Sequence, residues 1–253
     1  MSGGLSVPGQ AWRRVLILLA ALATMGVTAS LGLWQLGRAQ QKQALAEQIR
    51  TRAALPPLSA SELLAATDPL ADLYRPVRLK GRWVVGANVF LDNRPMAGRT
   101  GFVLLTPLRL QGSERVLVVQ RGWVPRDFQD RQKVPAVETP AGEVEIEGRL
   151  ALPPSQLFEL GEAGDGPIRQ NVDLPAYARA TGLPLLEGVS VQQTGSPGDG
   201  LLREWPAFAA DVPKHHGYAF QWFAMCGLTG ILYVWFQMIL PRRRRVAHES
   251  SSR

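Results

Sequence analysis

The sequence has 253 residues and a formal net charge of +7, from 28 Lys and Arg against 21 Asp and Glu. The charge is uneven: residues 37–216 carry 21 basic and 20 acidic side chains, so the excess lies at the two ends of the chain. This distribution does not support the basic stripe of a nucleic-acid-binding protein. The single cysteine, Cys226, excludes an intramolecular disulfide.

Two long runs contain no charged residue: residues 15–36, over 22 positions, and residues 217–240, over 24 positions. A hydrocarbon core of about 30 Å requires about 20 apolar residues, so each run predicts a transmembrane helix. A cleaved signal peptide is the alternative for the first run, because Arg13 and Arg14 precede it and small residues occur near Ala29 and Ser30. The length of the run favours a span, since signal cores have about 7–15 apolar residues.

The charged flanks predict the orientation of the two spans. Arg13 and Arg14 precede the first span, and a tail with five arginines and one glutamate follows the second. Short arginine-rich flanks stay in the cytoplasm, so both termini are expected there. Only 14 residues precede the first span, so no separate transit peptide is visible, and a bacterial inner membrane is favoured over a mitochondrial one. The expected order is a cytoplasmic tail (1–14), a span (15–36), a periplasmic domain (37–216), a span (217–240) and a basic cytoplasmic tail (241–253).

Between the spans the sequence changes from helical to strand-like. Residues 37–50 are good helix formers, so the first helix is expected to continue several turns past Leu36 and to stop by Pro56 and Pro57. Residues 173–182 predict a short helix with Asp173 as its N-cap and Gly182 as its stop. Runs rich in Val, Leu and Trp predict strands at 77–85, 87–92, 102–110, 115–124, 142–152 and 187–193.

The strand expected at 142–152 has one wet face. Val144, Ile146 and Gly148 alternate with glutamates at 143, 145 and 147, which is typical of an antiparallel sheet with one solvated side. The fold class is therefore an α+β membrane protein. Two transmembrane helices flank a mainly antiparallel extracytoplasmic β domain, a small sheet or partly closed barrel with one or two helices.

The intervening domain lacks the residues of most catalytic sites. Residues 37–213 contain no His and no Cys, and their only Met is Met96. This excludes from the domain a zinc or copper site of imidazole or thiolate ligands and a Ser-His or Cys-His nucleophile pair. The chain has no CxxC, GxGxxG or P-loop motif. Asp127 and Asp130 remain as a carboxylate pair, and two solvated loop charges are the favoured interpretation. We expect the protein not to be an enzyme.

Two of the three histidines stand where the second span begins, within residues 214–223 (KHHGYAFQWF). His215, Tyr218 and Trp222 are spaced i, i+3 and i+7, which predicts one helical stripe, and His216 points about a quarter-turn away. Tyr and Trp commonly lie at the membrane surface, and a histidine there can be merely interfacial. The alternative is a neutral imidazole that binds the iron of a lipid-soluble macrocycle.

The first span ends with GLWQLGRAQQK at residues 32–42, where Trp34 and Arg38 are spaced i, i+4 and Lys42 follows one turn later. Basic residues on the outer side run against the positive-inside trend. They suit either lipid phosphates, with snorkelling side chains, or the carboxylates of a cofactor.

Small residues spaced i, i+4 occur on both spans, at Gly26 and Ser30 and at Cys226 and Gly230. Such pairs let two helices approach closely, so the spans are expected to pack as a hairpin or against a partner's helices.

Four motifs in order resemble the Surfeit locus protein family, membrane-hairpin assembly factors of haem-copper cytochrome oxidase. The similarity covers nearly the whole chain, with a looser match at 171–182 (NVDLPAYARATG). The motifs are GLWQLGR (32–38), LYRPVRLKG (73–81), QRGWVPR (120–126) and HHGYAFQWF (215–223).

The resemblance implies a role in maturing the catalytic subunit of the oxidase, with haem a handled through one histidine. The family pattern at the second span is Asn, any residue, His, Leu, any residue, Tyr. Aligned on Tyr218, the family histidine falls on His215, whereas His216 stands at the leucine position and Pro213 at the asparagine position. These two departures leave His216 open as an alternative ligand.

The resulting hypothesis is an assembly factor that binds haem a transiently and helps to insert it into the catalytic subunit of cytochrome c oxidase. His215 is the expected iron ligand, Tyr218 and Trp222 line the macrocycle, and Arg38, next to Trp34, or Lys42 pairs with its propionates. The expected partners are the catalytic subunit, the haem a synthesis machinery and membrane lipids.

Three alternatives remain open to different degrees. The main one is a cofactor-free scaffold or chaperone that stabilises an oxidase subunit during assembly. A membrane enzyme acting on haem or lipid is less favoured. Copper delivery is disfavoured, because the chain has one cysteine, within a span, and one methionine in the domain.

Overall fold

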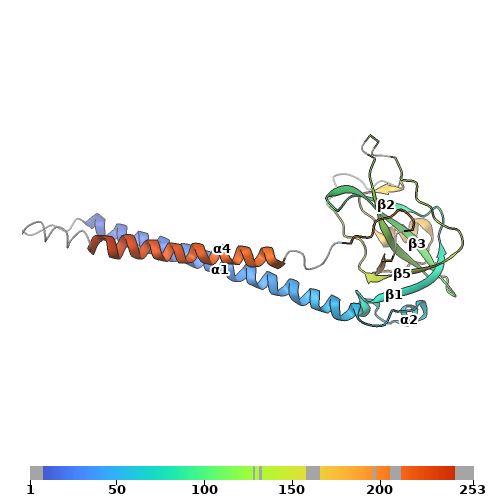
Figure 1. Cartoon of the computed structure of the whole chain (residues 1–253), viewed down its shortest axis with the longest axis horizontal. Coiled ribbons are helices and arrows are strands. Elements are labelled where there is room, and N and C mark those ends of the chain that lie inside the picture. Colours follow the sequence, from blue (N-terminus) through green and yellow to red (C-terminus); the bar gives the residue numbers. More distant parts are fainter. Residues whose placement is uncertain are drawn as a thin grey trace, which may run out of the picture. The chain divides into compact units, whose positions relative to one another are not determined.

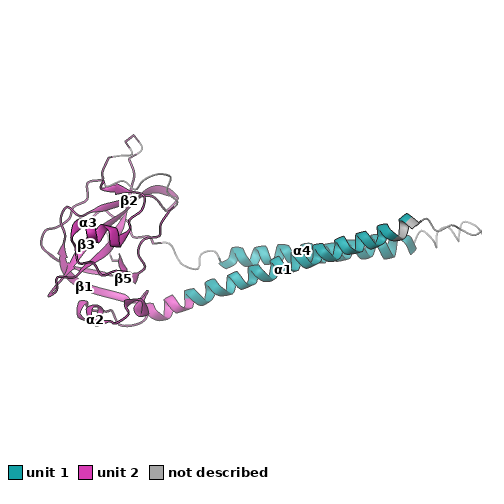
Figure 2. Cartoon of the chain, turned by 180° about the vertical axis from the view of Figure 1, so that it is seen from behind, with its two compact units in different colours: residues 1–46, 208–253 teal, residues 47–207 magenta. Residues whose placement is uncertain are grey.

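Two long helices and a β domain make up the computed structural model, which describes residues 8–127, 129–130, 133–157, 166–195, 198–205 and 212–242. The chain divides into two compact units (Figure 2). One contains residues 1–46 and 208–253, and the other contains residues 47–207. Of the two tails predicted at 1–14 and 241–253, residues 1–7 and 243–253 lie outside the described residues.

Helix α1 runs without a break from Pro8 to Ala53, over 46 residues. It continues past Leu36, as the helix-forming residues after the apolar run predict. The segment that follows contains Pro56 and Pro57, which disfavour helical conformation in the residues before them. The segment Trp12–Ala53 is long and apolar enough to cross a membrane.

Helix α4 (Val212–Val234) carries the second apolar run and has Pro213 in its first turn, where a missing N–H costs no hydrogen bond. It continues into a π-helical turn, η2 (Trp235–Ile239). The segment Val212–Arg242 also meets the length and hydropathy of a membrane span. Together the two apolar helices are those of a membrane protein.

Helices α1 and α4 lie side by side and antiparallel (Figures 1 and 2). Phe223 lies over Gly32, where a Cβ would come within 2.7 Å of the ring. Seven residues before Gly32 on α1, the Met25 carbonyl oxygen contacts the Cys226 thiol at 3.6 Å. Because lipid supplies no hydrophobic force between helices, this close packing is what holds a hairpin together.

One set of buried or half-buried positions on each helix is spaced in alternating steps of three and four residues, and we call this set the seam between the helices. This spacing is that of left-handed antiparallel or parallel helix pairs. Its α1 positions are Ala21, Met25, Thr28, Gly32, Gln35, Ala39 and Lys42, and its α4 positions are His215, Ala219, Trp222, Cys226, Thr229 and Tyr233.

The small residues at the seam are only partly those expected from the sequence. Gly26 is exposed, and a Cβ there would meet nothing within 4 Å, so Gly26 does not pack against the second span; packing of Gly26 and Ser30 against a partner's helices stays a prediction. The Ser30 hydroxyl instead donates to the Gly26 carbonyl of its own helix at 2.8 Å. Gly32 takes the expected role one and a half turns later. On α4 the prediction is confirmed, because Cys226 and Gly230 both face Met25.

The second unit is a strongly curved sheet whose strand order is β1-β5-β7-β4-β3-β2-β6, with an additional pairing of β1 with β3. That pairing closes five strands, β1, β5, β7, β4 and β3, into a barrel. Among the paired strands that the structure describes, β4 with β7 and β2 with β6 are parallel and the other pairs are antiparallel. The predicted mainly antiparallel domain is therefore confirmed. The strands are β1 (Pro76–Trp83), β2 (Val89–Met96), β3 (Arg99–Leu110), β4 (Val116–Pro125), β5 (Glu143–Ala151), β6 (Ile168–Arg169) and β7 (Ser190–Gln193).

Strand β3 is long enough to serve two neighbours on the same edge. Its first half pairs with β2, and its last residues, 108–110, pair with β1. At this closure Gly81 faces the β3 backbone, where a Cβ would lie 2.2 Å from the Arg109 carbonyl oxygen. A glycine is therefore required for β1 and β3 to meet.

The barrel interior is filled by side chains, among them Leu79, Leu108, Val119, Ile146 and Val191, each at most 3% exposed. The alternation expected for β5 is confirmed, since Ile146 and Gly148 are buried and the three glutamates are exposed. A second cluster on the other side of β3 and β4 packs against α3 (Leu174–Thr181). Helix α3 has the predicted Asp173 N-cap and the left-handed Gly182 at its end.

Two short helices precede the barrel, and neither was expected. Helix α2 (Ala60–Ala65) begins at a capping box in which the Ser59 and Glu62 side chains each bond the other's backbone N–H. The 3₁₀ turn η1 (Pro69–Asp72) follows, capped by Asp68. Ser59 and Glu62 have the spacing of this motif, so the sequence contained the signal for α2.

Replacing Gly81 by alanine is expected to destabilise the barrel by about 2–4 kcal/mol, because the new methyl group has to displace the β3 backbone. The measurement is urea unfolding of the full-length protein in detergent, followed by tryptophan fluorescence. Gly142→Ala is the matched control, since a Cβ there meets nothing within 4 Å, and its effect is expected within about 0.5 kcal/mol. Equal midpoints for the two variants would contradict the closure at Gly81.

The hairpin predicts a disulfide between a cysteine placed at Met25 and the native Cys226. The Cys226 sulfur already contacts the backbone of residue 25, so a Met25→Cys variant should cross-link on mild oxidation and lose both thiols to maleimide labelling. Gly26→Cys, which faces away from α4, should keep both. Equal cross-linking of the two variants would rule out the observed seam.

Candidate functional site

The imidazole of His215 is held between the two helices of the hairpin. It is half-buried, and its Nδ1 lies 2.7 Å from Oε1 of Gln35 on α1. An amide oxygen only accepts hydrogen bonds, so Nδ1–H is the donor. With Nδ1 as the donor, the neutral form of the ring has its lone pair on Nε2. His215 thus has one nitrogen occupied by the protein and the other in the form that binds metals.

His216 lies elsewhere on the hairpin. It is exposed, and its Nε2 is 3.4 Å from Nε2 of Gln43, a long contact. Gln43 follows the seam residue Lys42 by one position, and His216 follows the seam residue His215 by one position. Their contact shows that residues just after a seam position gather on one side of the hairpin.

Residues just before a seam position therefore gather on the opposite side. Arg38 precedes Ala39 and Tyr218 precedes Ala219, while Trp34 precedes Gln35. The Arg38 guanidinium lies over the Trp34 ring, 6.0 Å from its centroid, and its Nη1 donates to Gln41 Oε1 at 3.3 Å. Trp34 and Tyr218 are 56% and 50% exposed. This side of the hairpin, which we call the Trp34–Tyr218 side, presents a cation and two aromatic rings.

The predicted stripe of His215, Tyr218 and Trp222 divides in the structure. His215 and Trp222 are both half-buried seam residues, whereas Tyr218 lies beside the seam. Within the described part of the chain, no hydrogen bond or ring contact joins the Trp34 and Arg38 pair to any of the three. The site residues are therefore arranged around one region of the hairpin rather than bonded to one another.

These residues fit a haem in chemical type. The macrocycle supplies four of its iron's ligands, so one imidazole with a fixed second nitrogen suffices. Arg38 offers a planar cation to a carboxylate, and the exposed rings offer apolar faces. Among the described residues no group of three or more His, Cys, Asp and Glu side chains comes together, so a metal held only by several such protein ligands has no counterpart there.

Gln35 is the site residue that sequence reasoning missed. It lies in the motif GLWQLGR, between Trp34 and Arg38. An uncharged amide near the end of an apolar run is a signal in its own right, because a polar group in a span needs a partner. The contact with His215 provides that partner.

The motif QRGWVPR has a structural role in β4. Arg121 is buried, and its guanidinium donates to Thr139 Oγ1 and to the Glu138 carbonyl, both at 3.0 Å. It also lies 3.4 Å from the Asp199 carboxylate, which Arg203 contacts at 2.6 Å. Burial lowers the pKa of Arg121, and the Asp199 charge partly opposes that shift. The motif thus ties two loops to the barrel.

The motif LYRPVRLKG likewise joins segments of the second unit. Leu58 pairs with Val77 in a parallel bridge, and its N–H donates to the Pro76 carbonyl at 2.8 Å. Arg75 donates from Nε to the Pro56 carbonyl at 2.9 Å and pairs with Asp72 at 3.1 Å. Hydrogen bonds therefore join the segment after α1 to the first strand of the barrel.

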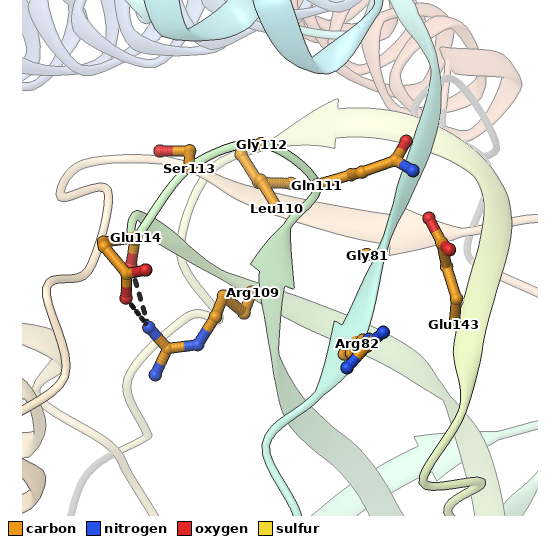
Figure 3. A pocket seen from close by; sticks show the side chains of 9 residues that line it. All are labelled: Gly81, Arg82, Arg109, Leu110, Gln111, Gly112, Ser113, Glu114 and Glu143. Atoms are coloured by element: carbon orange, nitrogen blue, oxygen red, sulfur yellow. Dashed lines mark hydrogen bonds and ion pairs between the residues drawn. The ribbon is translucent and has the colours of Figure 1, made fainter.

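A pocket of about 510 Å³ opens on the barrel between β1, the turn after β3 and the start of β5 (Figure 3). Arg82 lies in register with Glu143 on one side and with Arg109 on the other, and Arg109 pairs with Glu114. The neighbouring cross-strand pairs of β1 and β5, Arg78 with Glu147 and Lys80 with Glu145, are ion pairs. In the described residues Arg82 and Glu143 form no such ion pair, although they lie in register on β1 and β5. None of the predicted site residues lines this pocket.

The Asp127 carboxylate accepts several hydrogen bonds within its own loop. It accepts from Lys133 Nζ at 2.9 Å and from the backbone N–H groups of Gln129 and Asp130. The Lys133 hydrogen bond, followed by these two backbone bonds, lowers the pKa of Asp127 to about 2. Such a carboxylate is a weak base at neutral pH, which favours the structural interpretation of Asp127 and Asp130.

The side-chain carbon of Asp127 is expected to titrate in NMR near pH 2, and Lys133→Ala should move this midpoint towards the ordinary 3.8. Because the folded-state pKa is the lower one, any stability from this contact is present above about pH 4 and disappears as the pH falls through 2. A midpoint near 3.8 in the unmodified protein would contradict the loop contact.

Comparison with known proteins places these observations in a family. The model of the SURF1 family matches residues 22–227. A SURF1-like protein of Rickettsia felis is 26% identical over 226 residues, which cover 85% of this chain and 94% of that protein. Surfeit locus protein 1 of Arabidopsis thaliana is 26% identical over 222 residues, with 70% of this chain and 62% of that protein covered. A SURF1-like protein of Drosophila melanogaster is 25% identical over 257 residues, with 89% and 77% covered.

The matched range begins within the first apolar run and ends within the second, so it includes both Gln35 and His215 as well as the whole barrel. The family model covers far more than half of the chain, and the alignment covers more than two thirds of the relative's own length in two of the three cases. This chain belongs to the SURF1 family.

Proposed function

We propose that this protein is an assembly factor for haem-copper cytochrome c oxidase, which binds haem a and helps to insert it into the catalytic subunit. The observation that carries the proposal is the contact of His215 Nδ1 with the Gln35 side-chain oxygen, which leaves Nε2 as the nitrogen with the lone pair in the neutral ring. Membership of the SURF1 family supports the link to oxidase assembly. Partners on this proposal are the catalytic subunit, the machinery that makes haem a, and membrane lipids.

Each residue of the site has a distinct role in this proposal. His215 would hold the iron through Nε2, and Arg38, whose guanidinium lies over the Trp34 ring, would pair with a propionate. Tyr218 and Trp222 supply aromatic faces to the ring system. His216 lies on the other side of the hairpin from Arg38 and Tyr218, which supports His215 over His216 as the ligand.

A transfer protein has to release what it binds. A single imidazole whose other nitrogen bonds a neutral amide is a weaker ligand than one backed by a carboxylate. The site therefore suits transient occupancy better than permanent storage. Since residues 37–213 contain no His or Cys, we propose binding and delivery rather than enzymatic turnover.

We also propose the bacterial inner membrane as the location, with both termini in the cytoplasm and the barrel in the periplasm. The support is the charge distribution: Arg13, Arg14 and the arginines from 242 onwards flank the two spans, while the middle of the chain is nearly neutral.

A second candidate function is a scaffold that binds no cofactor and holds an oxidase subunit during assembly. The pocket lined by Arg82 and Glu143 favours the scaffold, because these two side chains do not pair with each other. A pocket with charges of both signs can receive a polar loop of another protein. In that case the hairpin histidines would have no ligand role.

The deciding experiment is the visible spectrum of the full-length protein, purified in mild detergent from cells that make haem a, beside His215→Ala and His216→Ala. We expect partial haem a occupancy in the unmodified protein, at least a tenfold loss in His215→Ala and little change in His216→Ala. The three samples also need a test of oxidase assembly in cells.

Other outcomes separate the alternatives. Loss of haem in His216→Ala alone would make that residue the ligand and overturn the assignment to His215. Three folded but colourless proteins that still restore oxidase in cells would favour the scaffold. Loss of oxidase assembly in an Arg82→Glu, Glu143→Arg double variant would add support to that function.

A further inference from the structure

The contact between Gln35 and His215 joins two segments that are 180 residues apart in the sequence. At 2.7 Å between Gln35 Oε1 and His215 Nδ1 it is a short hydrogen bond, and both residues are half-buried seam residues. The seam packs the two helices closely at Gly32, one turn before Gln35. The backbone positions that bring the two groups together are thus set by the hairpin itself.

The hydrogen bond selects one of two forms of the neutral ring. An imidazole carries its proton on either Nδ1 or Nε2, and in free histidine the Nε2–H form predominates. The Gln35 oxygen accepts only, so it stabilises the Nδ1–H form. That form leaves the lone pair on Nε2, the nitrogen remote from α1's amide.

We propose that Gln35 is a positioning residue for His215, which holds the imidazole in the Nδ1–H form so that Nε2 is ready for haem iron. The inference rests on the proposed haem-binding function. Gln35 does not touch the iron or the macrocycle in this role. It acts through His215, and it fixes both the orientation of the ring and the nitrogen that is available.

The charge of the accepting group has a second consequence. A carboxylate behind an imidazole draws the Nδ1 proton strongly and makes Nε2 a better donor to metal, whereas a neutral amide does so weakly. Gln35 therefore sets the iron bond at a strength that permits release. A glutamate at the same position should hold haem longer, and a leucine should fail to orient the ring.

The chain offers a matched control on the same helix. Gln43 is a second α1 glutamine that faces a histidine of α4, but it contacts His216 on the other side of the hairpin. Gln43→Leu removes an amide of equal size from the same helix without touching the Gln35 and His215 pair. Any effect shared by Gln35→Leu and Gln43→Leu would therefore be a general effect on the helix.

The first measurement uses the full-length protein without haem, labelled with ¹⁵N-histidine in nanodiscs, at a pH where imidazole is neutral. Long-range proton–nitrogen correlations identify the protonated nitrogen, and His215→Ala assigns the signal. The unmodified protein and Gln43→Leu are expected to show Nδ1–H at His215. Gln35→Leu is expected to shift it mostly to Nε2–H.

The second measurement uses the same variants loaded with haem a, and follows transfer of the haem to excess apomyoglobin by its visible spectrum. Removing a group that orients a metal-bound histidine typically costs 10- to 100-fold in affinity. We therefore expect release from Gln35→Leu to be about 10- to 100-fold faster, release from Gln35→Glu to be several-fold slower, and Gln43→Leu to match the unmodified protein.

The outcomes distinguish this inference from the proposed function. Haem that is bound by the unmodified protein, lost in His215→Ala and released equally from Gln35→Leu upholds the function and overturns the positioning role. An unmodified protein without haem overturns both. Faster release from Gln35→Leu with an unchanged Nδ1–H signal, and without cross-linking of Met25→Cys to Cys226 in that background, would make Gln35 a helix-packing residue and also overturn the positioning role.

Discussion

The close approach of two helix backbones at Gly32 is the constraint on which the hairpin depends. The Phe223 ring occupies the space that any larger side chain would fill, and Ala39 and Ala219, both at most 2% exposed, continue the close contact. In lipid this packing cannot draw on a hydrophobic force, so it needs small residues and interhelical hydrogen bonds. Gln35 and His215 supply such a bond on the same seam. The seam therefore contains both the residues that pack the helices and the hydrogen-bonded His215.

The sequence alone predicted much of the fold. Two spans, six of the seven strands found in the described residues, and the helix from Asp173 to Gly182 follow from apolar runs, alternation and caps, which are local signals. Barrel closure was left open between a sheet and a partly closed barrel, because it depends on β1 meeting the far end of β3. A glycine in a strand, such as Gly81, indicates that another backbone approaches closely, but it does not identify which strand approaches.

The candidate site was predicted residue by residue but without its geometry. Spacing within one helix assigned His215, Tyr218 and Trp222 to one stripe, yet periodicity cannot tell which edge of that stripe faces a second helix. The same limit explains why Gly26 was chosen over Gly32. Gln35 was missed because its meaning comes only from a histidine 180 residues away. The antiparallel register of two spans is long-range information that a single helix does not carry.

The four family motifs divide by role. Those on the hairpin bring together the groups with ligand chemistry, whereas those on the barrel hold chain segments in place. Arg121 and Arg203 converge on Asp199, and Arg121 also binds the backbone at Glu138, so two loops are fastened by guanidinium groups. These side chains are almost fully buried, where hydrogen bonds to charged groups are stronger than at the surface.

The arginine clamps make folding of the barrel independent of thiol chemistry. Small extracytoplasmic domains commonly fix their loops by disulfides, which form only where an oxidant and an exchange catalyst are present. This chain has one cysteine, and it lies in α4. Guanidinium hydrogen bonds need neither an oxidant nor an exchange catalyst. The barrel can therefore reach the same structure in a reducing or an oxidising compartment.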